Sequence, residues 1–254
     1  MDPRQPSEAN ARAAAMPPEL MQDPLLELEA VTAAYGRIQV LNGVDLAVPA
    51  GTVLALLGPN GGGKSTTLKV ASCQMEPTSG RVKIAGRTVN GATSEQLAEL
   101  GVCTIPEGRG IFANLTVREN LELATYTGKS LSAIEDRTYS FFPRLAERRH
   151  QLAGTMSGGE QQMLSMSRAL SSDPVLLMLD ELSMGLAPLV VEELYAVVSQ
   201  VAGEGVSILV VEQFARTVLG VADWAAIMLG GRITRVGPPG ELEQELTAAY
   251  LGDR

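Results

Sequence analysis

The chain has 254 residues, enough for one large domain or for a core with an inserted lobe. Hydrophobic residues make up 45% of it, but no apolar run approaches the ~20 residues of a membrane-spanning helix, so we expect any membrane association to be peripheral. The formal net charge is −9 and no long basic stripe is visible, which argues against a broad nucleic-acid-binding surface.

The N-terminal segment differs in composition from the rest. It is rich in Ala, Pro, Glu and Gln, lacks periodic apolar positions, and contains no apolar segment of the kind that a secretory signal requires. We therefore predict a disordered tail over residues 1–24. The alternative is a start codon placed too far upstream, because Met16 and Met21 lie just before the patterned sequence.

Strand and helix patterns alternate through residues 25–254, which we predict to form one domain. Such alternation indicates an α/β fold with a mainly parallel sheet that helices cover on both faces. The predicted strands cover residues 25–31, 40–46, 52–57, 81–84, 87–89, 101–105, 175–180, 206–211 and 224–229. The predicted helices begin near Lys64, after Ser157 and at Pro239, and cover residues 132–142, 188–202 and 213–220.

The middle stretch, residues 116–170, is more polar and looks helical. Thr116 and Glu119 have the spacing of a capping box at its start. Pro143 is expected to stop a helix inside it. We interpret this stretch as a helical subdomain, approximately residues 112–171, inserted into the core.

A glycine-rich loop between an apolar strand and a helix fits the G-x-x-x-x-G-K-[ST] pattern. Glycines let consecutive backbone N–H groups point at phosphate oxygens, and the helix N-terminus adds its positive dipole end. Lys64 would reach the β- and γ-phosphates, and the Ser65 hydroxyl would ligate Mg²⁺. A glycine-rich turn without a ligand is the alternative, which the strand, loop and helix in register disfavour. The predicted nucleotide-binding residues of this loop are Gly58, Pro59, Asn60, Gly61, Gly62, Gly63, Lys64, Ser65 and Thr66.

A second candidate element is an apolar run over residues 175–179 that ends in two carboxylates, Asp180 and Glu181. At the C-terminal end of a buried parallel strand, Asp180 would hold Mg²⁺, and Glu181 would orient and deprotonate the attacking water. The alternative is a strand that merely ends in solvated acids. The independent Lys64 loop favours the catalytic interpretation.

A third motif, Ser157-Gly158-Gly159-Glu160-Gln161, lies between these two in the chain. It resembles the signature sequence of ABC ATPases, and the order of the three motifs is theirs. The resemblance covers about residues 25–254. It implies a P-loop NTPase fold with a mainly parallel core sheet, an antiparallel β subdomain and an inserted helical subdomain. It also implies that Ser157, Gly158 and Gly159 contact the γ-phosphate bound to an opposite subunit, so that two ATPase subunits pair.

Tyr35 follows the first predicted strand, where this family usually has an aromatic residue that stacks on adenine. The resemblance therefore implies a nucleobase contact for Tyr35. A tyrosine of the core or of the surface is the alternative.

Three positions depart from the common pattern of the family. Glu107 replaces a Gln that contacts Mg²⁺, and a carboxylate can still coordinate the metal. Gln213 replaces a His that senses the γ-phosphate; it can donate a hydrogen bond but cannot carry the charge of an imidazolium. Ala187 replaces an Asp that helps to couple the two sites. Because Glu181 is intact, we expect ATP hydrolysis, with Glu181, Lys64 and Gln213 as the catalytic residues.

The departures resemble a particular subfamily. Residues 105–112, 180–188 and 211–215 are similar to the ATP-binding subunits of branched-chain amino acid importers, with their Pro-Glu-Gly-Arg, Gly-Leu-Ala-Pro and Val-Glu-Gln segments. In such systems two ATPases, identical or homologous, sit beneath two membrane permease subunits, and a substrate-binding protein delivers the amino acid. ATP-driven closure of the ATPase dimer powers import. Urea or short-chain amide importers use similar ATPases, so the solute stays open.

Cys73 and Cys103 lack metal-ligand spacing, and we interpret them as free core thiols in a reducing compartment.

The resemblance implies a peripheral position on the cytoplasmic face of the cell membrane. Residues 107–116 are expected to receive a coupling helix of the permease through Phe112 and Leu115. Packing of these two side chains within the helical subdomain is the alternative.

Two other function classes fit less well. A soluble ABC ATPase that acts on DNA or ribosomes carries a long coiled-coil insertion or two cassettes, whereas this chain has one cassette, a short helical lobe and an acidic charge. An unrelated P-loop kinase or GTPase lacks the Ser157-Gly158-Gly159 element. We therefore expect ATP and Mg²⁺ as cofactors and no nucleic-acid partner.

Overall fold

Six strands form the central sheet of the computed structural model, which describes residues 16–108, 110–213 and 215–242. The strand order is β10-β9-β3-β8-β7-β6, and neighbouring strands are parallel except for β10 with β9. The predicted α/β fold with a mainly parallel sheet is confirmed. The strands are β3 (Val53–Leu57), β6 (Val102–Ile105), β7 (Leu176–Asp180), β8 (Ser207–Glu212), β9 (Trp224–Leu229) and β10 (Arg232–Gly237).

A second sheet is antiparallel, with the strand order β2-β1-β4-β5. Its strands are β1 (Pro24–Tyr35), β2 (Ile38–Pro49), β4 (Ser79–Ile84) and β5 (Arg87–Thr88). The antiparallel β subdomain that the family resemblance implied is therefore present. β1 and β2 are longer than predicted, because their ends pair with each other beyond the apolar positions on which the prediction rested.

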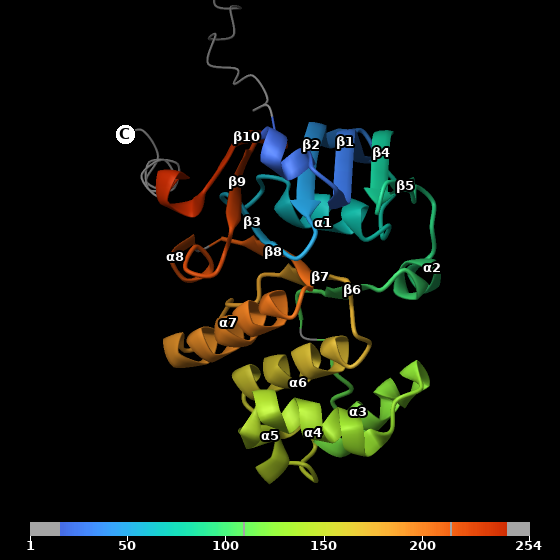
Figure 1. Cartoon of the computed structure of the whole chain (residues 1–254), viewed down its shortest axis with the longest axis vertical. Coiled ribbons are helices and arrows are strands. Elements are labelled where there is room, and N and C mark those ends of the chain that lie inside the picture. Colours follow the sequence, from blue (N-terminus) through green and yellow to red (C-terminus); the bar gives the residue numbers. More distant parts are fainter. Residues whose placement is uncertain (1–15, 109, 214, 243–254) are drawn as a thin grey trace, which may run out of the picture.

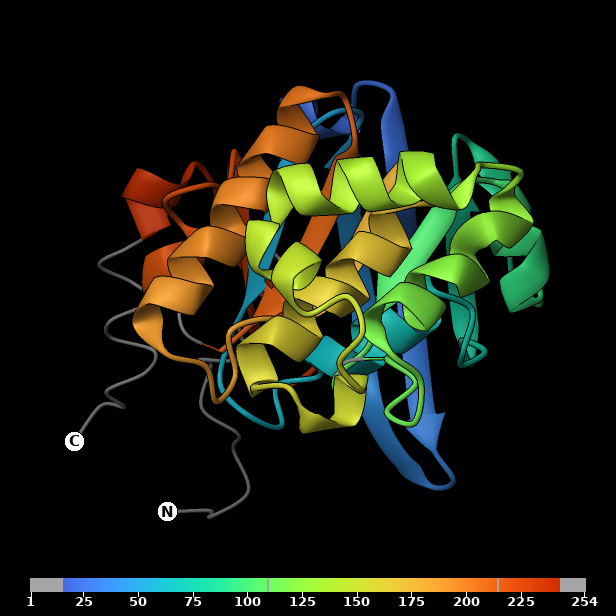
Figure 2. The ribbon, with the colours of Figure 1, turned by 90° about the horizontal axis from the view of Figure 1, so that it is seen from below.

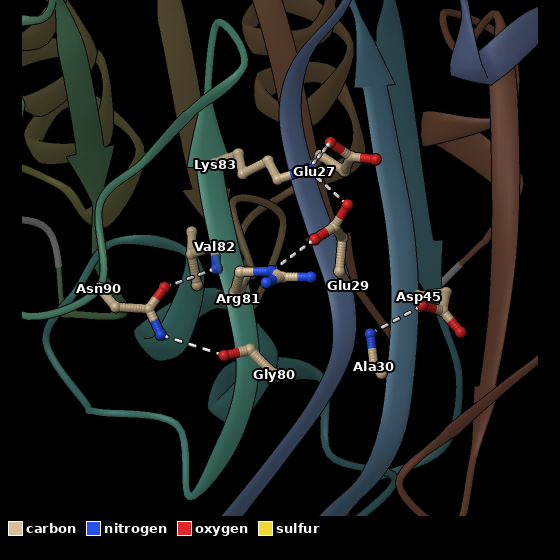
Figure 3. Close-up of polar contacts among 9 residues, drawn as sticks. All are labelled: Glu27, Glu29, Ala30, Asp45, Gly80, Arg81, Val82, Lys83 and Asn90. Atoms are coloured by element: carbon tan, nitrogen blue, oxygen red, sulfur yellow. Dashed lines mark hydrogen bonds and ion pairs between the residues drawn. The ribbon is translucent and has the colours of Figure 1, made fainter.

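A bulge interrupts β1 near its middle (Figure 3). Ala30 has φ 46°, and its N–H donates to Asp45 Oδ1 at 2.7 Å. Next to the bulge, the Glu29 carboxylate forms ion pairs with Arg81 and Lys83 of β4, the Arg81 Nε lying 2.9 Å from Glu29 Oε2. Such bulges bend a strand and increase its local twist.

Helices cover both faces of the six-stranded sheet, as predicted. α1 (Lys64–Ala71) lies between the two sheets, and α7 (Pro188–Gly203) covers the opposite face (Figure 1). Two shorter helices are α2 (Ser94–Glu99) and α8 (Ala215–Val218). No helix in the described part of the chain is long and apolar enough to cross a membrane.

The remaining helices form a lobe below the central sheet in Figure 1, and Figure 2 shows the same lobe from below, with α7 beside it. α6 joins the lobe to the core, because it packs against α3 and α5 on one side and α7 on the other. These elements are α3 (Val117–Glu122), η2 (Leu123–Thr127), α4 (Leu131–Phe141), α5 (Pro143–Glu147), η3 (Ala153–Thr155) and α6 (Gly158–Leu170), the η elements being 3-10 helices.

Local signals placed several helix ends correctly. Thr116 and Glu119 form the predicted capping box at the start of α3. α4 ends at Phe141, but Pro143 does more than stop it, because this residue also opens α5. A proline suits the first turn of a helix, where its missing N–H would have no partner. The prediction for Pro143 was therefore incomplete.

Two apolar clusters lie on opposite faces of the central sheet. Along β3, Val53, Ala55 and Leu57 belong to the cluster that includes α6 and α7. Leu54 and Leu56 belong to the cluster that includes α1 and the antiparallel sheet. Successive side chains of a strand point to opposite faces, so a strand that is buried on both sides is apolar at every position.

Several elements differ from the predictions. η1 (Pro18–Met21) precedes the expected domain start at residue 25, and its Leu20 is fully buried. α2 and β10 were not predicted, and α8 is shorter than the expected helix over residues 213–220. The terminal helix begins at Pro239 as predicted, with residues 239–242 described. Residues 1–15 of the predicted tail lie outside the described residues.

Candidate functional site

The glycine-rich loop joins the end of β3 to the start of α1. Gly58 lies so close to β9 that a Cβ there would be 2.2 Å from the Met228 carbonyl oxygen. Gly63, the N-cap of α1, has φ 105°, a conformation that L side chains rarely adopt. Both glycines are therefore required by the backbone path, which points the N-terminus of α1 into the loop.

Lys64 is the first residue of α1 and is 4% exposed. Its Nζ donates to the carbonyl oxygens of Gly58 at 2.8 Å and Pro59 at 3.2 Å. Burial lowers the pKa of the Lys64 ammonium, while the charges of Glu181 and Asp180 act in the opposite direction. The ammonium thus lies within the loop and close enough to both acids to interact with their charges.

Asp180 lies at the carboxyl end of β7, where it faces α1. The Ser65 hydroxyl donates to Asp180 Oδ1 at 3.5 Å. Burial, together with the neighbouring charges of Glu181 and Glu107, raises the pKa of Asp180 to about 6. The structure therefore brings Ser65 and Asp180 together, and their joint binding of Mg²⁺ stays a prediction.

Glu181 follows directly, in a strained conformation with φ 49°. Its N–H donates to the Val211 carbonyl oxygen of β8 at 2.8 Å, so the backbone is fixed where the chain leaves the sheet. Burial raises the pKa of Glu181, Lys64 lowers it, and Glu107 and Glu212 raise it. A carboxyl group with a raised pKa is a better proton acceptor near neutral pH than an ordinary one.

The three acids Glu107, Asp180 and Glu181 line one open cleft of about 540 Å³. Gln161 and Gln162, from the first turns of α6, line its other side. The described residues contain no group of three or more His, Cys, Asp or Glu arranged to hold a metal by themselves. Mg²⁺ is commonly bound by one or two carboxylates together with substrate phosphates. A hydroxyl and a carboxylate beside a phosphate-binding loop fit that mode.

Gln213 follows the last residue of β8 and is half-buried. β8 runs between β3 and β7, with Glu212 opposite Leu57 and Val211 opposite Asp180. Gln213 therefore follows the strand that lies between the strand of the glycine-rich loop and the strand of the acids. Its contact with a phosphate stays a prediction.

Ser157 caps α6 at the surface of the lobe. Its hydroxyl donates to Glu160 Oε2 at 2.8 Å, and Arg148 forms an ion pair with the other oxygen of Glu160 at 2.6 Å. Gly159 packs so closely on α7 that a Cβ there would lie 2.5 Å from Val190 Cγ1. Ser157, Gly158 and Gly159 are not among the residues that line the cleft of the acids. The contact of Ser157, Gly158 and Gly159 with a γ-phosphate stays a prediction.

Tyr35 ends β1 and is 48% exposed. The Lys69 ammonium of α1 lies 6.0 Å from the centroid of its ring. Tyr35 is thus a surface tyrosine beside the helix that follows the glycine-rich loop, and part of its ring is accessible. Adenine stacking on Tyr35 stays a prediction.

A family model described as ABC transporter matches residues 41–183, more than half of the chain. The chain belongs to the ABC transporter family. It is 40% identical, over 90% of its length and 100% of the relative, to the high-affinity branched-chain amino acid transport ATP-binding protein BraG of Pseudomonas aeruginosa. It is 34% identical, over 86% of its length and 94% of the relative, to the probable branched-chain amino acid transport ATP-binding protein LivF of Archaeoglobus fulgidus.

Solved structures agree with this assignment. One described as the structure of the ATP binding subunit of an ABC transporter has a TM-score of 0.77 and 29% identity, covering 88% of this chain and 93% of that chain. The expected family, fold and enzyme class are confirmed: this ABC ATPase is a nucleotide-binding, ATP-hydrolysing transporter subunit.

The expected partner surface of the ABC ATPase is partly exposed. Phe112 is 51% exposed, and the Arg168 guanidinium lies 4.8 Å from its ring centroid. Leu115 is half-buried. The backbone of Phe112 is held by the buried Asn120, whose side chain bonds both its N–H and its carbonyl oxygen. Contact of these side chains with a permease stays a prediction.

One buried acid of the site was missed by the sequence analysis. Glu212 is 1% exposed and accepts hydrogen bonds from the Ser183 N–H and the Tyr195 hydroxyl. The available signal was an acid at the end of the apolar run Ile208–Val211, immediately before Gln213.

Proposed function

We propose that this ABC ATPase drives the import of branched-chain amino acids. The observation that carries the proposal is its 40% identity to BraG over the whole length of that protein. The segments that depart from the common pattern add support, because residues 105–112, 180–188 and 211–215 are similar to those of branched-chain amino acid importer ATPases.

In the proposed reaction, ATP binds along the glycine-rich loop, with Lys64 against its β- and γ-phosphates and Tyr35 against adenine. Glu181 accepts a proton from water as the water oxygen attacks the γ-phosphorus, and the bond to the β–γ bridging oxygen breaks to release ADP. Gln213 donates a hydrogen bond to the γ-phosphate. The raised pKa of Glu181 supports its role as the proton acceptor.

Ser65, Asp180 and Glu107 would hold Mg²⁺. The metal supplies neutralisation of the charge on the β- and γ-phosphate oxygens when it is bound. The support is electrostatic: the Asp180 pKa is raised to about 6 by burial and by two neighbouring acids, and a cation would stabilise these carboxylates together.

We further propose that two ATPase subunits, identical or homologous, pair so that Ser157, Gly158 and Gly159 of one contact the γ-phosphate held by the other. The exposure of Ser157 at the N-terminus of α6 supports this pairing, because the N-terminus of a helix can bind an anion there. Two permease subunits would hold the pair at the cytoplasmic face of the membrane, with residues 107–116 as the contact. A substrate-binding protein would deliver the solute to the permeases.

The proposal is tested by transport. We would purify the membrane complex through a tag on this chain, reconstitute it in proteoliposomes with ATP and Mg²⁺ inside, and measure uptake of labelled leucine in the presence of the co-purified binding protein. ATP-dependent uptake that is absent in a Glu181→Gln complex is the expected result. Uptake of urea or a short-chain amide without leucine uptake would instead support the alternative importer, and recovery of ribosomal or DNA-repair proteins without a permease would refute import.

A further inference from the structure

The loop that follows the catalytic acids is tied to the neighbouring strand by a buried carboxylate. Glu212 is the last residue of β8 and is 1% exposed. Its Oε1 accepts two hydrogen bonds of 2.8 Å, one from the Ser183 N–H and one from the Tyr195 hydroxyl. Ser183 belongs to the loop over residues 181–187, and Tyr195 belongs to α7, which that loop enters. One oxygen atom therefore connects three elements.

Two consecutive residues of β8 hold the start of this loop. The Val211 carbonyl oxygen accepts from the Glu181 N–H at 2.8 Å, and the Glu212 side chain accepts from the Ser183 N–H. Between these two points the chain turns sharply, with Glu181 at φ 49°. A non-glycine residue in this region costs about 1–3 kcal/mol, and the conformation persists only where its surroundings over-determine it. The two hydrogen bonds supply that constraint.

We propose that Glu212 is a positioning residue for ATP hydrolysis, which holds the loop over residues 181–187 in register with Gln213, the next residue of its own chain. Glu181 and Gln213 act on the same γ-phosphate in the proposed function, on which this inference rests. They come from different strands, and Glu212 is the side chain that fixes one relative to the other. Tyr195 is the second support, because its hydroxyl holds the Glu212 carboxylate against α7.

The hydrogen bond between the Tyr195 hydroxyl and the Glu212 carboxylate is suited to hold the loop over residues 181–187 rigidly. Burial and the Glu212 charge raise the pKa of Tyr195, so its hydroxyl stays protonated and can donate. Tyr195 is 2% exposed, which leaves water little access to compete for the same oxygen. A buried carboxylate without donors would be strongly disfavoured, so the two hydrogen bonds are needed for this geometry to persist.

Three substitutions separate the hydrogen bonds from the charge. Glu212→Gln keeps an acceptor oxygen for both donors, removes the charge and replaces the other oxygen by an NH₂ group. Glu212→Ala removes the acceptor. Tyr195→Phe removes one donor and leaves the carboxylate in place. The matched control is Tyr139→Phe, because the Tyr139 hydroxyl also donates to a glutamate, Glu135 Oε1 at 3.1 Å, but does so in the helical lobe.

The experiment measures kcat and the KM for ATP of the membrane complex purified through a tag on this chain, together with urea unfolding of each purified variant chain. We expect Glu212→Ala to lower kcat by about 100-fold, the loss that a misplaced catalytic group causes. We expect the KM to change by less than about threefold, because ATP binding does not depend on this support. Tyr195→Phe should lower kcat by about 3- to 10-fold and Glu212→Gln should retain kcat within about fivefold. Tyr139→Phe should match the wild type.

A wild-type kcat for both Glu212→Ala and Tyr195→Phe would overturn the inference, and so would parallel changes of kcat and KM that follow the loss of stability. If Glu212→Ala does not fold, Tyr195→Phe decides, since it leaves the buried carboxylate in place. Glu181→Gln in the same assay separates the catalytic role of Glu181 from the positioning role of Glu212. An active Glu181→Gln would refute the catalytic assignment itself, whereas an inactive Glu181→Gln beside an active Glu212→Ala would refute only the role of Glu212.

Discussion

Replacing Asp180 with asparagine should stabilise the nucleotide-free protein while abolishing hydrolysis. Asp180 is 7% exposed, and its pKa is raised to about 6 from an ordinary value of 3.8, first by burial and then by Glu181 and Glu107. The charged carboxylate is therefore disfavoured in the folded state. Asparagine has the same shape, keeps an acceptor for the Ser65 hydroxyl and carries no charge.

The magnitude and the pH dependence follow from proton linkage. The native state keeps the proton up to about pH 6 and the unfolded chain releases it near 3.8, so the contribution of this group to the free energy of unfolding falls as the pH rises between these values. Each pKa unit corresponds to about 1.4 kcal/mol, which gives about 3 kcal/mol at full effect. Solvent at the open cleft screens part of this, so we expect a gain of about 1–2 kcal/mol for Asp180→Asn at pH 7.5.

The assay is urea unfolding of nucleotide-free wild type, Asp180→Asn and a control, Asp136→Asn, at pH 7.5 and pH 4.5. Asp136 is an exposed aspartate of α4, and its substitution should leave the stability unchanged. The advantage of Asp180→Asn should shrink at pH 4.5, because much of the native wild-type carboxyl is then protonated. An Asp180→Asn protein that is less stable than wild type at pH 7.5 would show that the charge of Asp180 does not lower the free energy of unfolding, which would refute the reasoning.

Three further substitutions test other contacts. Gly159→Ala places a Cβ 2.5 Å from Val190 Cγ1 and should lower the free energy of unfolding by about 1–3 kcal/mol, with recovery in a Gly159→Ala, Val190→Ala double variant measured by urea unfolding. Tyr35→Ala should weaken ATP binding by about 1–3 kcal/mol in calorimetry while Tyr35→Phe stays near wild type, because stacking needs only the ring. Asn120→Ala leaves the Phe112 N–H and carbonyl oxygen without their buried partner and should cost about 1–3 kcal/mol by urea unfolding. A wild-type free energy of unfolding for Gly159→Ala or for Asn120→Ala would contradict the corresponding contact. A wild-type affinity of Tyr35→Ala for ATP would contradict adenine stacking.

The central sheet could be predicted because its strands are buried on both faces. Val53–Leu57 is apolar at all five positions, and each side chain is at most 1% exposed, so the run is continuous in the sequence. β10 shows the opposite case. It lies at the edge of the sheet, and its residues Arg232 and Arg235 are exposed, so it contains no continuous apolar run. The local signal for it was the Gly230-Gly231 turn that precedes it. α2 was missed although Thr93 and Gln96 form a capping box, since its short helix buries only Leu97.

The candidate site could be predicted where its reactive residues lie next to one another in the sequence. The loop before α1 and the acids at the end of β7 each combine an apolar strand with reactive residues in one short segment. Contacts between segments were not accessible in this way. Gly159 was predicted from its expected contact with an anion, whereas the structure gives it a second reason, its close approach to Val190. Nothing in the local sequence relates these two residues, which meet only because α6 crosses α7.

Two departures from the family pattern, Glu107 and Gln213, change the charge around Asp180 and Glu181. Glu107 places a carboxylate where most ABC ATPases have an amide, and its charge raises the pKa of both Asp180 and Glu181. Gln213 places a neutral amide where most have a histidine, so no imidazolium charge can offset the acids. Of the neighbouring charges that act on Glu181, Lys64 is the one that lowers its pKa. A bound cation would stabilise these carboxylates together, so in the proposed function the same residues would set both the affinity for Mg²⁺ and the ability of Glu181 to take a proton.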